Sequence, residues 1–140
     1  PDNIRLEIKD SSGDVEIEGV STLSLKDSSG DVHLEDIEGS VTLNDSSGDL
    51  VLEDIEGDVT VDSDSSGDIR GRDVEGSVLV RRDSSGDIRF IDVSRDFTVE
   101  RDSSGDITAK GVGGDFIVVA DGSGEIVAKN VDGEIQKPKS

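Results

Sequence analysis

Oxygen-bearing side chains that could bind a cation recur along the chain in one short motif. Asp-Ser-Ser-Gly-Asp, followed by Val, Ile or Leu, occurs six times, and residues 121–125 form a degenerate seventh copy. Carboxylates and hydroxyls are the hard oxygen ligands that Ca²⁺ prefers. One interpretation is therefore a ladder of calcium ions held by the first and last aspartates of each motif. These aspartates are Asp10, Asp14, Asp27, Asp31, Asp45, Asp49, Asp64, Asp68, Asp83, Asp87, Asp102 and Asp106.

The same residue types also make a tight turn without any metal. The first aspartate can accept backbone N–H groups, the serine hydroxyls can bond to the corner, and the glycine can adopt a positive φ. The motif lacks the Gly-Gly-x-Gly-x-Asp register of calcium-binding β-rolls. Neighbouring carboxylates on exposed columns repel by only about 0.9 kcal/mol in bulk water, and by less in salt. We therefore favour turn chemistry and expect no cofactor, with calcium as the alternative.

The spacing of the motif predicts the fold. First residues of successive copies are separated by 17, 18, 19, 19, 19 and 19 positions, and a period of this length with one turn signal is typical of a solenoid. Within each repeat, apolar residues alternate with polar ones, as in Val32, Leu34 and then Ile37, followed by Val41 and Leu43. Alternation at period two directs one face inward. The sequence predicts an all-β parallel β-solenoid of about seven rungs of 17–19 residues.

Successive rungs should pair at a spacing of about 4.8 Å, so that equivalent apolar residues stack in continuous columns. Val32 should then lie beside Leu50. Phe90 should lie between Gly71 and Ala109, so that its large ring has small neighbours on both sides. Residues 1–140 are expected to form one domain, with residues 1–9 as a half repeat and residues 132–140 as a frayed edge. Handedness and cross-section are left open.

A second corner in each repeat contains Glu-Gly-Ser or Glu-Gly-Asp, as at Glu38-Gly39-Ser40 and Glu56-Gly57-Asp58. Glycine is the residue best suited to a backbone with positive φ. We therefore expect Gly39, Gly57 and Gly76 to adopt positive φ values at this corner.

Composition excludes several kinds of partner. The chain has 34 acidic and 14 basic residues, a net charge of −20, and no cysteine. Nucleic acids and anionic lipid surfaces call for Lys and Arg, so neither is expected as a partner. No apolar run is long enough to insert in a membrane, and cysteine-based metal sites are excluded. Residues 1–69 carry a charge of −17, whereas residues 70–140 carry −3.

The basic residues gather in one part of the repeat array. Seven arginines lie between Arg70 and Arg101. We expect them to balance neighbouring acidic rungs, for example by a pair between Glu53 and Arg72, with a patch for an anionic partner as the alternative. The single histidine, His33, is expected to be a solvated surface residue rather than a metal ligand.

Catalysis is not expected. Every corner is two to five residues long, so the fold has no loops to wall a substrate cleft. Carboxylates are abundant, but no pair is singled out for acid–base work. Trp and Tyr, which commonly form carbohydrate platforms, are absent. The sequence therefore predicts a protein that is not an enzyme.

Two kinds of turn alternate along the chain. Ser66-Gly67-Asp68-Ile69 and Ser85-Gly86-Asp87-Ile88 are of one kind, and Gly57-Asp58-Val59 is of the other. In this pattern, which covers nearly the whole chain, the sequence resembles the adhesin-type β-helix family of bacterial cell-envelope proteins, of the Ser-Gly-Asp repeat type. The resemblance implies a parallel β-solenoid that is exported or envelope-associated, with no catalytic residues to transfer.

The function predicted from these observations is a non-catalytic structural or adhesin-like rod, located outside the cell or in the cell envelope. A fibre subunit that associates end to end is one alternative, and a calcium-stabilised acidic repeat module is another. The pattern encodes turns and columns, so it does not identify a protein or surface ligand.

Overall fold

The computed structural model confirms the parallel β-solenoid. It describes residues 5–10, 14–19, 21–27, 30–45, 48–64, 67–83, 85–120, 122 and 124–137, excepting the side chains of residues 5–8, 10, 27, 45 and 64. The strands are β1 (Arg5–Asp10), β2 (Val15–Glu18), β3 (Thr22–Asp27), β4 (Val32–Ile37), β5 (Val41–Asp45), β6 (Leu50–Ile55), β7 (Val59–Asp64), β8 (Ile69–Val74), β9 (Val78–Val80), β10 (Ile88–Val93), β11 (Phe97–Val99), β12 (Ile107–Val112), β13 (Phe116–Val118), β14 (Ile126–Val131) and β15 (Ile135–Gln136).

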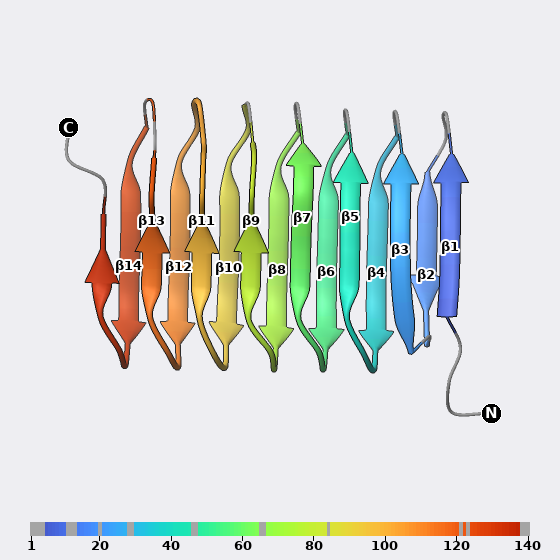
Figure 1. Cartoon of the computed structure of the whole chain (residues 1–140), viewed down its shortest axis with the longest axis horizontal. Coiled ribbons are helices and arrows are strands. Elements are labelled where there is room, and N and C mark those ends of the chain that lie inside the picture. Colours follow the sequence, from blue (N-terminus) through green and yellow to red (C-terminus); the bar gives the residue numbers. More distant parts are fainter. Residues whose placement is uncertain are drawn as a thin grey trace.

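These strands form two parallel sheets. The odd-numbered strands make an eight-stranded sheet in the order β1-β3-β5-β7-β9-β11-β13-β15, and the even-numbered strands make a seven-stranded sheet from β2 to β14. Strands of the two sheets run in opposite directions across the rod (Figure 1). Each coil therefore has a two-sheet cross-section, the feature that the sequence left open. The seven even-numbered strands are linked by about six complete turns of the chain.

Equivalent residues of successive coils lie side by side. Val32 pairs with Leu50, Leu50 with Ile69, and Ile69 with Ile88. All four side chains are 0% exposed. The predicted stacking of apolar columns is confirmed, and these columns form one continuous core between the two sheets.

The aromatic rings fit the core as the sequence predicted. Phe90 pairs with Gly71 on one side and Ala109 on the other, and a Cβ added at Gly71 would overlap the Phe90 ring. Phe97 and Phe116 stack with ring centroids 5.3 Å apart, and Phe90 meets Phe97 edge-on at 5.2 Å. Because interiors are packed to near crystal density, each ring fixes the size of its neighbours.

A left-handed residue bends each strand of the seven-stranded sheet. Asp36, Asp54, Asp73 and Asp92 have φ values of 55°, 53°, 55° and 62°. Asp is among the few residue types other than Gly that tolerate this region. The bend explains why the third apolar residue comes three positions after the second, not two, since the extra residue allows Ile37 to turn inward.

The prediction of positive φ at the second corner was wrong. No positive φ occurs at Gly39, Gly57 or Gly76, whereas the glycines of the Asp-Ser-Ser-Gly-Asp motif do adopt it, with 102° at Gly67. At Gly57 an added Cβ would overlap the backbone of Gly39 in the preceding coil. Close approach of two coils, and not φ, therefore requires glycine at this corner.

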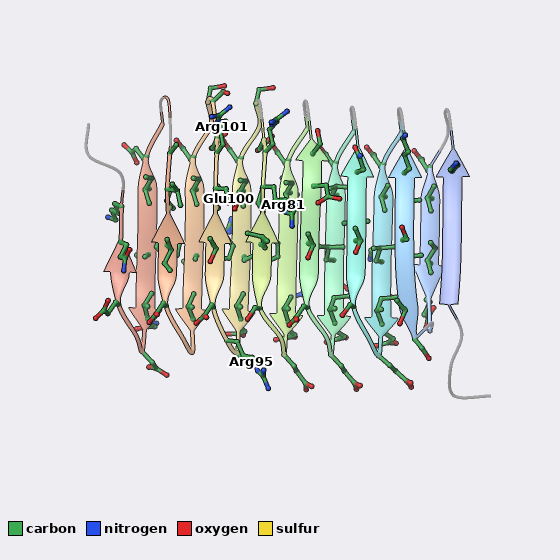
Figure 2. The ribbon with its side chains drawn as sticks, in the orientation of Figure 1. Arg81, Arg95, Glu100 and Arg101 are labelled. Carbon is green, nitrogen blue, oxygen red and sulfur yellow. The ribbon has the colours of Figure 1, made fainter. Side chains whose placement is uncertain are left out.

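Arginines project from the corners at opposite ends of the strands. Arg95 lies at the second corner and Arg101 near the first, and both side chains point away from the rod (Figure 2). Both residues are exposed. Part of the basic cluster seen in the sequence therefore lies at the corners, and the rest lies elsewhere on the rod.

The two ends of the described chain are single strands. At one end, β1 lies in the predicted half repeat and pairs with β3. At the other end, β15 pairs with β13 through Ile135 and Gln136. Pro1 and Pro138 lie outside the described residues. In the described residues, no helix exists that could cross a membrane.

Candidate functional site

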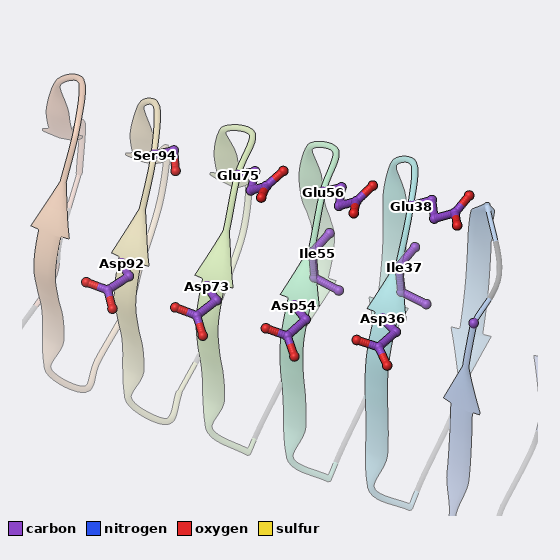
Figure 3. Close-up of a pocket in the computed structure, with 11 residues that line it drawn as sticks. Asp36, Ile37, Glu38, Asp54, Ile55, Glu56, Asp73, Glu75, Asp92 and Ser94 are labelled. Atoms are coloured by element: carbon purple, nitrogen blue, oxygen red, sulfur yellow. The ribbon is translucent and has the colours of Figure 1, made fainter.

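The bend and the second corner together build an acidic groove. In each coil the left-handed aspartate is followed by a buried Ile or Val and then by an exposed residue, Glu in three coils, as in Asp36, Ile37 and Glu38. Stacking repeats this triplet along the rod (Figure 3). The resulting corner groove has a volume of about 680 Å³. It is lined by Gly19, Asp36, Ile37, Glu38, Asp54, Ile55, Glu56, Asp73, Glu75, Asp92 and Ser94.

Two rows of carboxylates border the corner groove. One row contains Asp36, Asp54, Asp73 and Asp92, and Figure 3 shows it parallel to the row that begins at Glu38. Neighbours within a row are one coil apart, about 4.8 Å. Such rows create a negative potential that concentrates cations near the surface. The aspartate side chains are exposed, so the rows are an electrostatic feature of an open surface.

The last aspartate of each Asp-Ser-Ser-Gly-Asp motif bonds to the next coil. The Oδ1 atom of Asp49 accepts the backbone N–H of Asp68 at 2.9 Å, and that of Asp68 accepts the N–H of Asp87 at 2.9 Å. The same bond recurs from Asp14 to Glu125 at 2.9–3.0 Å. The sequence analysis gave a hydrogen-bonding role to the first aspartate and did not predict this bond of the last one. The motif therefore joins successive coils as well as turning the chain.

The first aspartate of the motif points inward where its side chain is described. Asp83 and Asp102 are 0% and 1% exposed and pair through a parallel bridge. The sequence analysis treated both aspartate columns as exposed, which is wrong for these two residues. Strict alternation from the inward residues Val78 and Val80 would make residue 82 the next to face the core, so the inward direction of Asp83 shows that the chain departs from alternation after Val80. The side chains of Asp10, Asp27, Asp45 and Asp64 lie outside the described residues.

Similar hydrogen bonds from backbone N–H groups to aspartate side chains join successive coils at the second corner. The Oδ1 atoms of Asp58, Asp96 and Asp115 accept the backbone N–H of the equivalent residue in the next coil at 2.9 Å. Asp therefore has the same structural task at both corners. For the calcium alternative this means that one oxygen of each last aspartate is already engaged in a hydrogen bond. Calcium binding by the twelve aspartates stays a prediction.

A group of potential metal ligands occurs elsewhere in the described part of the chain, on the outer face of the seven-stranded sheet. His33, Glu35 and Glu53 bring one ligand atom each within 4.8 Å of one another. The Nε2 atom of His33 lies 3.9 Å from Oε2 of Glu53, with the two side chains 41% and 34% exposed. The sequence analysis compared His33 only with residues of its own coil. The sequence did contain a signal for this group, namely the column of Glu18, Glu35 and Glu53. This column places Glu53 on the coil after His33 and close to it.

The acidic column also changes the ionisation of Glu35. Desolvation by surrounding groups raises the pKa of Glu35 above its usual value of 4.5, and the charges of Glu18, Asp36 and Glu53 raise it further. His33 acts in the opposite direction and lowers it. The site is therefore a strained cluster of like charges on a partly exposed face.

Arginines lie next to this cluster on the same face. Arg70, Arg72 and Arg89 surround a hollow of about 430 Å³, with Val51 and Ile91 also in its wall. Arg70 forms an ion pair with Asp68 at 3.7 Å. Within the described residues Arg72 and Arg89 form none, although Arg72 lies opposite Glu53 in the register.

The expectation that the arginines balance acidic rungs is therefore confirmed only in part. Arg81 has such a partner, Asp62, at 3.7 Å. The predicted pair of Glu53 with Arg72 is wrong at the level of side chains, because no ion pair joins these two described residues. On the outer face of the seven-stranded sheet, Arg72 and Arg89 therefore form no ion pair with another described residue.

The coil geometry agrees with a comparison against protein families. A family described as Toastrack DUF4097 matches residues 2–110, which is most of the chain. The chain belongs to the Toastrack DUF4097 family. No curated protein and no solved structure matches the Toastrack chain. The match agrees with the β-solenoid repeat inferred from the Ser-Gly-Asp turns, whereas the adhesin part of the earlier resemblance is not part of this finding.

Proposed function

We propose that the Toastrack chain is a non-catalytic structural rod with an adhesin-like role, holding or spacing other parts of a larger assembly. The observation that supports this function is the continuity of bonding along the rod. Both sheets pair every coil with the next, with one shift of register after Leu43 where β5 meets β7, and side-chain bonds join coils at both corners. A rod joined at four places in each coil resists bending, because any bend must lengthen bonds on one side.

The surface supports a non-catalytic role. The corner groove is an open channel with repeated carboxylates, and no single coil differs enough to define a reacting pair. Efficient acid–base catalysis needs groups with matched roles in a site that excludes water. Incubation of the purified chain with glycans should therefore give no turnover, and measurable release of sugar would overturn this proposal.

A repeat duplication tests the rod function. Inserting a second copy of residues 88–106 adds one coil, so the rod should lengthen by about 4.8 Å. Small-angle scattering would measure the maximum dimension of the original and the lengthened chain. The rod function predicts growth in length with an unchanged cross-section, and growth of the cross-section would contradict it.

We also propose that the rod acts outside the cell or in the cell envelope. The proposal is based on the resemblance of the turn pattern to envelope proteins and on the strongly acidic surface, which keeps molecules dispersed. Protease added to intact cells that carry the full-length protein should degrade an exposed rod. Protection until the cells are lysed would contradict a location at the outer surface.

The partly uncovered last coil favours a second candidate, a fibre subunit joined at its ends. Ile126, Ala128 and Val131 of β14 are only partly buried, and Ile135 is 48% exposed. An uncovered strand edge can pair with a further strand. Static light scattering should then show growth beyond a dimer as concentration rises, and a mass that stays fixed would rule against end-to-end association.

Calcium stabilisation is tested separately by chelation. If calcium bridged the aspartate columns, EDTA would lower the unfolding temperature measured by circular dichroism. The favoured turn chemistry predicts no change, because backbone N–H groups already bond to the last aspartates. A clear loss of stability with EDTA, reversed by added Ca²⁺, would make calcium the better interpretation.

A further inference from the structure

The outer face of the seven-stranded sheet has its charges divided between its two halves. We call the first two outward residues of each of its strands, from β2 to β14, the divided face, which leaves out the exposed left-handed aspartates of the same strands. The strand register places them in two straight columns. One column contains Glu16, His33, Val51, Arg70, Arg89, Thr108 and Val127, and the other contains Glu18, Glu35, Glu53, Arg72, Ile91, Lys110 and Lys129.

All the acids of this face lie on β2, β4 and β6, and all its Arg and Lys residues lie on β8 to β14. The sign changes between Glu53 and Arg72, which are direct neighbours in the register. The divided face holds four acids and five bases, so it is close to neutral, although the whole chain carries −20. A second copy would therefore meet less net repulsion at this face than at the acidic corners.

The charges of the basic half are not neutralised within the chain. In the part of the chain that the structure describes, no ion pair involves Arg72, Arg89, Lys110 or Lys129. Arg70 pairs with Asp68, which lies at the corner and not on the face. On the acidic half, like charges are crowded around Glu35, which raises its pKa. Each half thus lacks the partner that the other half offers.

We propose that the divided face binds the divided face of a second copy of this chain, with the two rods antiparallel. A two-fold axis between β6 and β8 places the acidic half of each copy over the basic half of the other. Glu53 of one copy then lies opposite Arg72 of the other, and Glu18 lies opposite Lys110. Such an interface is isologous, because both copies use the same surface.

The shape of the divided face suits this pairing. The hollow of about 430 Å³ has Glu53 in its wall as well as Arg70, Arg72 and Arg89, and its three arginines can receive an acidic side chain of the second copy. Six opposed strands, β2 to β12, at about 4.8 Å, each crossed by about six residues at about 3.3 Å, give an area of roughly 600 Å² per copy. Interfaces with less than about 1,200 Å² in total are at the low end for specific complexes. The dimer should therefore be weak and reversible.

Acidic corners border the divided face and work against association. The left-handed aspartates lie along one edge, and the last aspartates of the motifs lie along the other. At about 0.15 M ionic strength the Debye length is about 8 Å, so repulsion between distant corners is screened more than attraction between charges in contact. The dimer should therefore be favoured by physiological salt relative to very dilute buffer.

A charge exchange in the full chain tests the proposal. Sedimentation equilibrium in about 0.15 M salt should show a monomer–dimer equilibrium for the unchanged protein. Glu53→Arg and Arg72→Glu, each alone, place like charges opposite one another twice in the symmetric dimer and should weaken it at least tenfold. The double variant restores opposite charges with their signs exchanged, and its dissociation constant should return to within about threefold of the original.

Arg95→Glu is the matched control. It makes the same change of charge at an exposed corner that points away from the rod (Figure 2), so it should leave the dimer within about twofold. Circular dichroism confirms that each variant is folded. A strict monomer, single variants no weaker than the control, or a double variant without rescue would each overturn the proposal.

Two further outcomes identify a different use of the face. Growth beyond a dimer would show end-to-end association and overturn the face-to-face arrangement. A monomer that binds dextran sulfate, with binding lost in Arg72→Glu and kept in Arg95→Glu, would show that the basic half serves an anionic partner instead of a second copy.

Discussion

Individual side chains in this rod are constrained by the residue one coil away more than by their neighbours in sequence. Gly71 shows this most clearly, because the Phe90 ring of the next coil occupies the space where its side chain would be. Gly57 is constrained in the same way by the backbone of Gly39. Which residue a position can hold therefore depends on the space left by its column neighbours, and a single substitution affects the packing of two coils.

Gly71→Ala should destabilise the rod by about 1–3 kcal/mol, because it overpacks a core that has no spare volume. Urea unfolding followed by circular dichroism measures the change. Adding Phe90→Leu should recover part of the loss, since it removes the ring atoms that the new methyl group meets. If Gly71→Ala leaves stability unchanged, Phe90 does not lie against residue 71.

The raised pKa of Glu35 predicts how the stability of the fold depends on pH. Its pKa is raised in the folded chain by desolvation and by Glu18, Asp36 and Glu53. The folded state therefore binds the proton more readily than the unfolded state, and the fold gains stability as pH falls through the raised pKa. Glu35→Gln should be more stable than the unchanged chain at pH 7, and this advantage should shrink towards pH 4.5.

The comparison is made by urea unfolding at several pH values and at low protein concentration, with Glu100→Gln as a control on an exposed position away from the cluster. Taking the difference between chains removes the titration of the other carboxylates. An advantage of Glu35→Gln that is constant from pH 7 to 4.5 would show that Glu35 is not under strain.

At the scale of strands and turns, periodicity predicted more than turn chemistry did. Alternation in Val32, Leu34 and Val41 placed the strands and their inward faces, because burial of one side of a strand demands period two. The same pattern predicted the neighbours of Phe90. The left-handed bend at Asp36 was missed, since Asp at that position reads equally well as an ordinary exposed residue.

The bond made by the last aspartate of each motif was missed for a related reason. A turn motif considered alone suggests bonds within the turn, whereas the Oδ1 of Asp68 bonds to Asp87 in the next coil. Local sequence contains no signal for a bond between residues 19 positions apart, except the repetition itself. The strand that leads into Asp83 did not contain the signal for burial either, because alternation from Val78 and Val80 would place residue 82, and not Asp83, on the inward side.

Asp68→Ala should cost about 0.5–1.5 kcal/mol, because the N–H of Asp87 loses its partner. Asp68→Asn keeps a carbonyl oxygen at the same place and removes one charge from an acidic column. It also removes the exposed ion pair with Arg70, which contributes little, so it should be close to neutral. Urea unfolding of the two variants separates the hydrogen bond from the charge. Equal losses in both would mean that the charge and not the bond matters.

On the scale of the whole molecule, repetition converts local features into surfaces. One left-handed aspartate per coil becomes a groove, and a change from Glu to Arg along a column becomes a face with two halves. The sequence analysis found the change of sign in that column. It could not show that Arg72 and Arg89 form no ion pair with another described residue, because the lengths and directions of side chains decide ion pairs.

The match of residues 2–110 to the Toastrack DUF4097 family agrees with the repeat architecture. Function at this scale depends on what the rod holds or touches, and repeats that encode turns and columns are silent on that point. The proposals of a structural rod and of a paired face are therefore tested separately. Lengthening by one coil addresses the first, and charge exchange addresses the second.

Register between successive coils is the central claim, and the absence of cysteine in the chain makes it directly measurable. Thr42 and Thr60 are outward partners on adjacent strands, about 4.8 Å apart, which suits a disulfide. Thr42→Cys with Thr60→Cys should oxidise to an intramolecular disulfide with loss of free thiols, whereas Thr42→Cys with Thr98→Cys, three coils apart, should not. Failure of the first pair to close, or closure of both, would contradict the stacked coils.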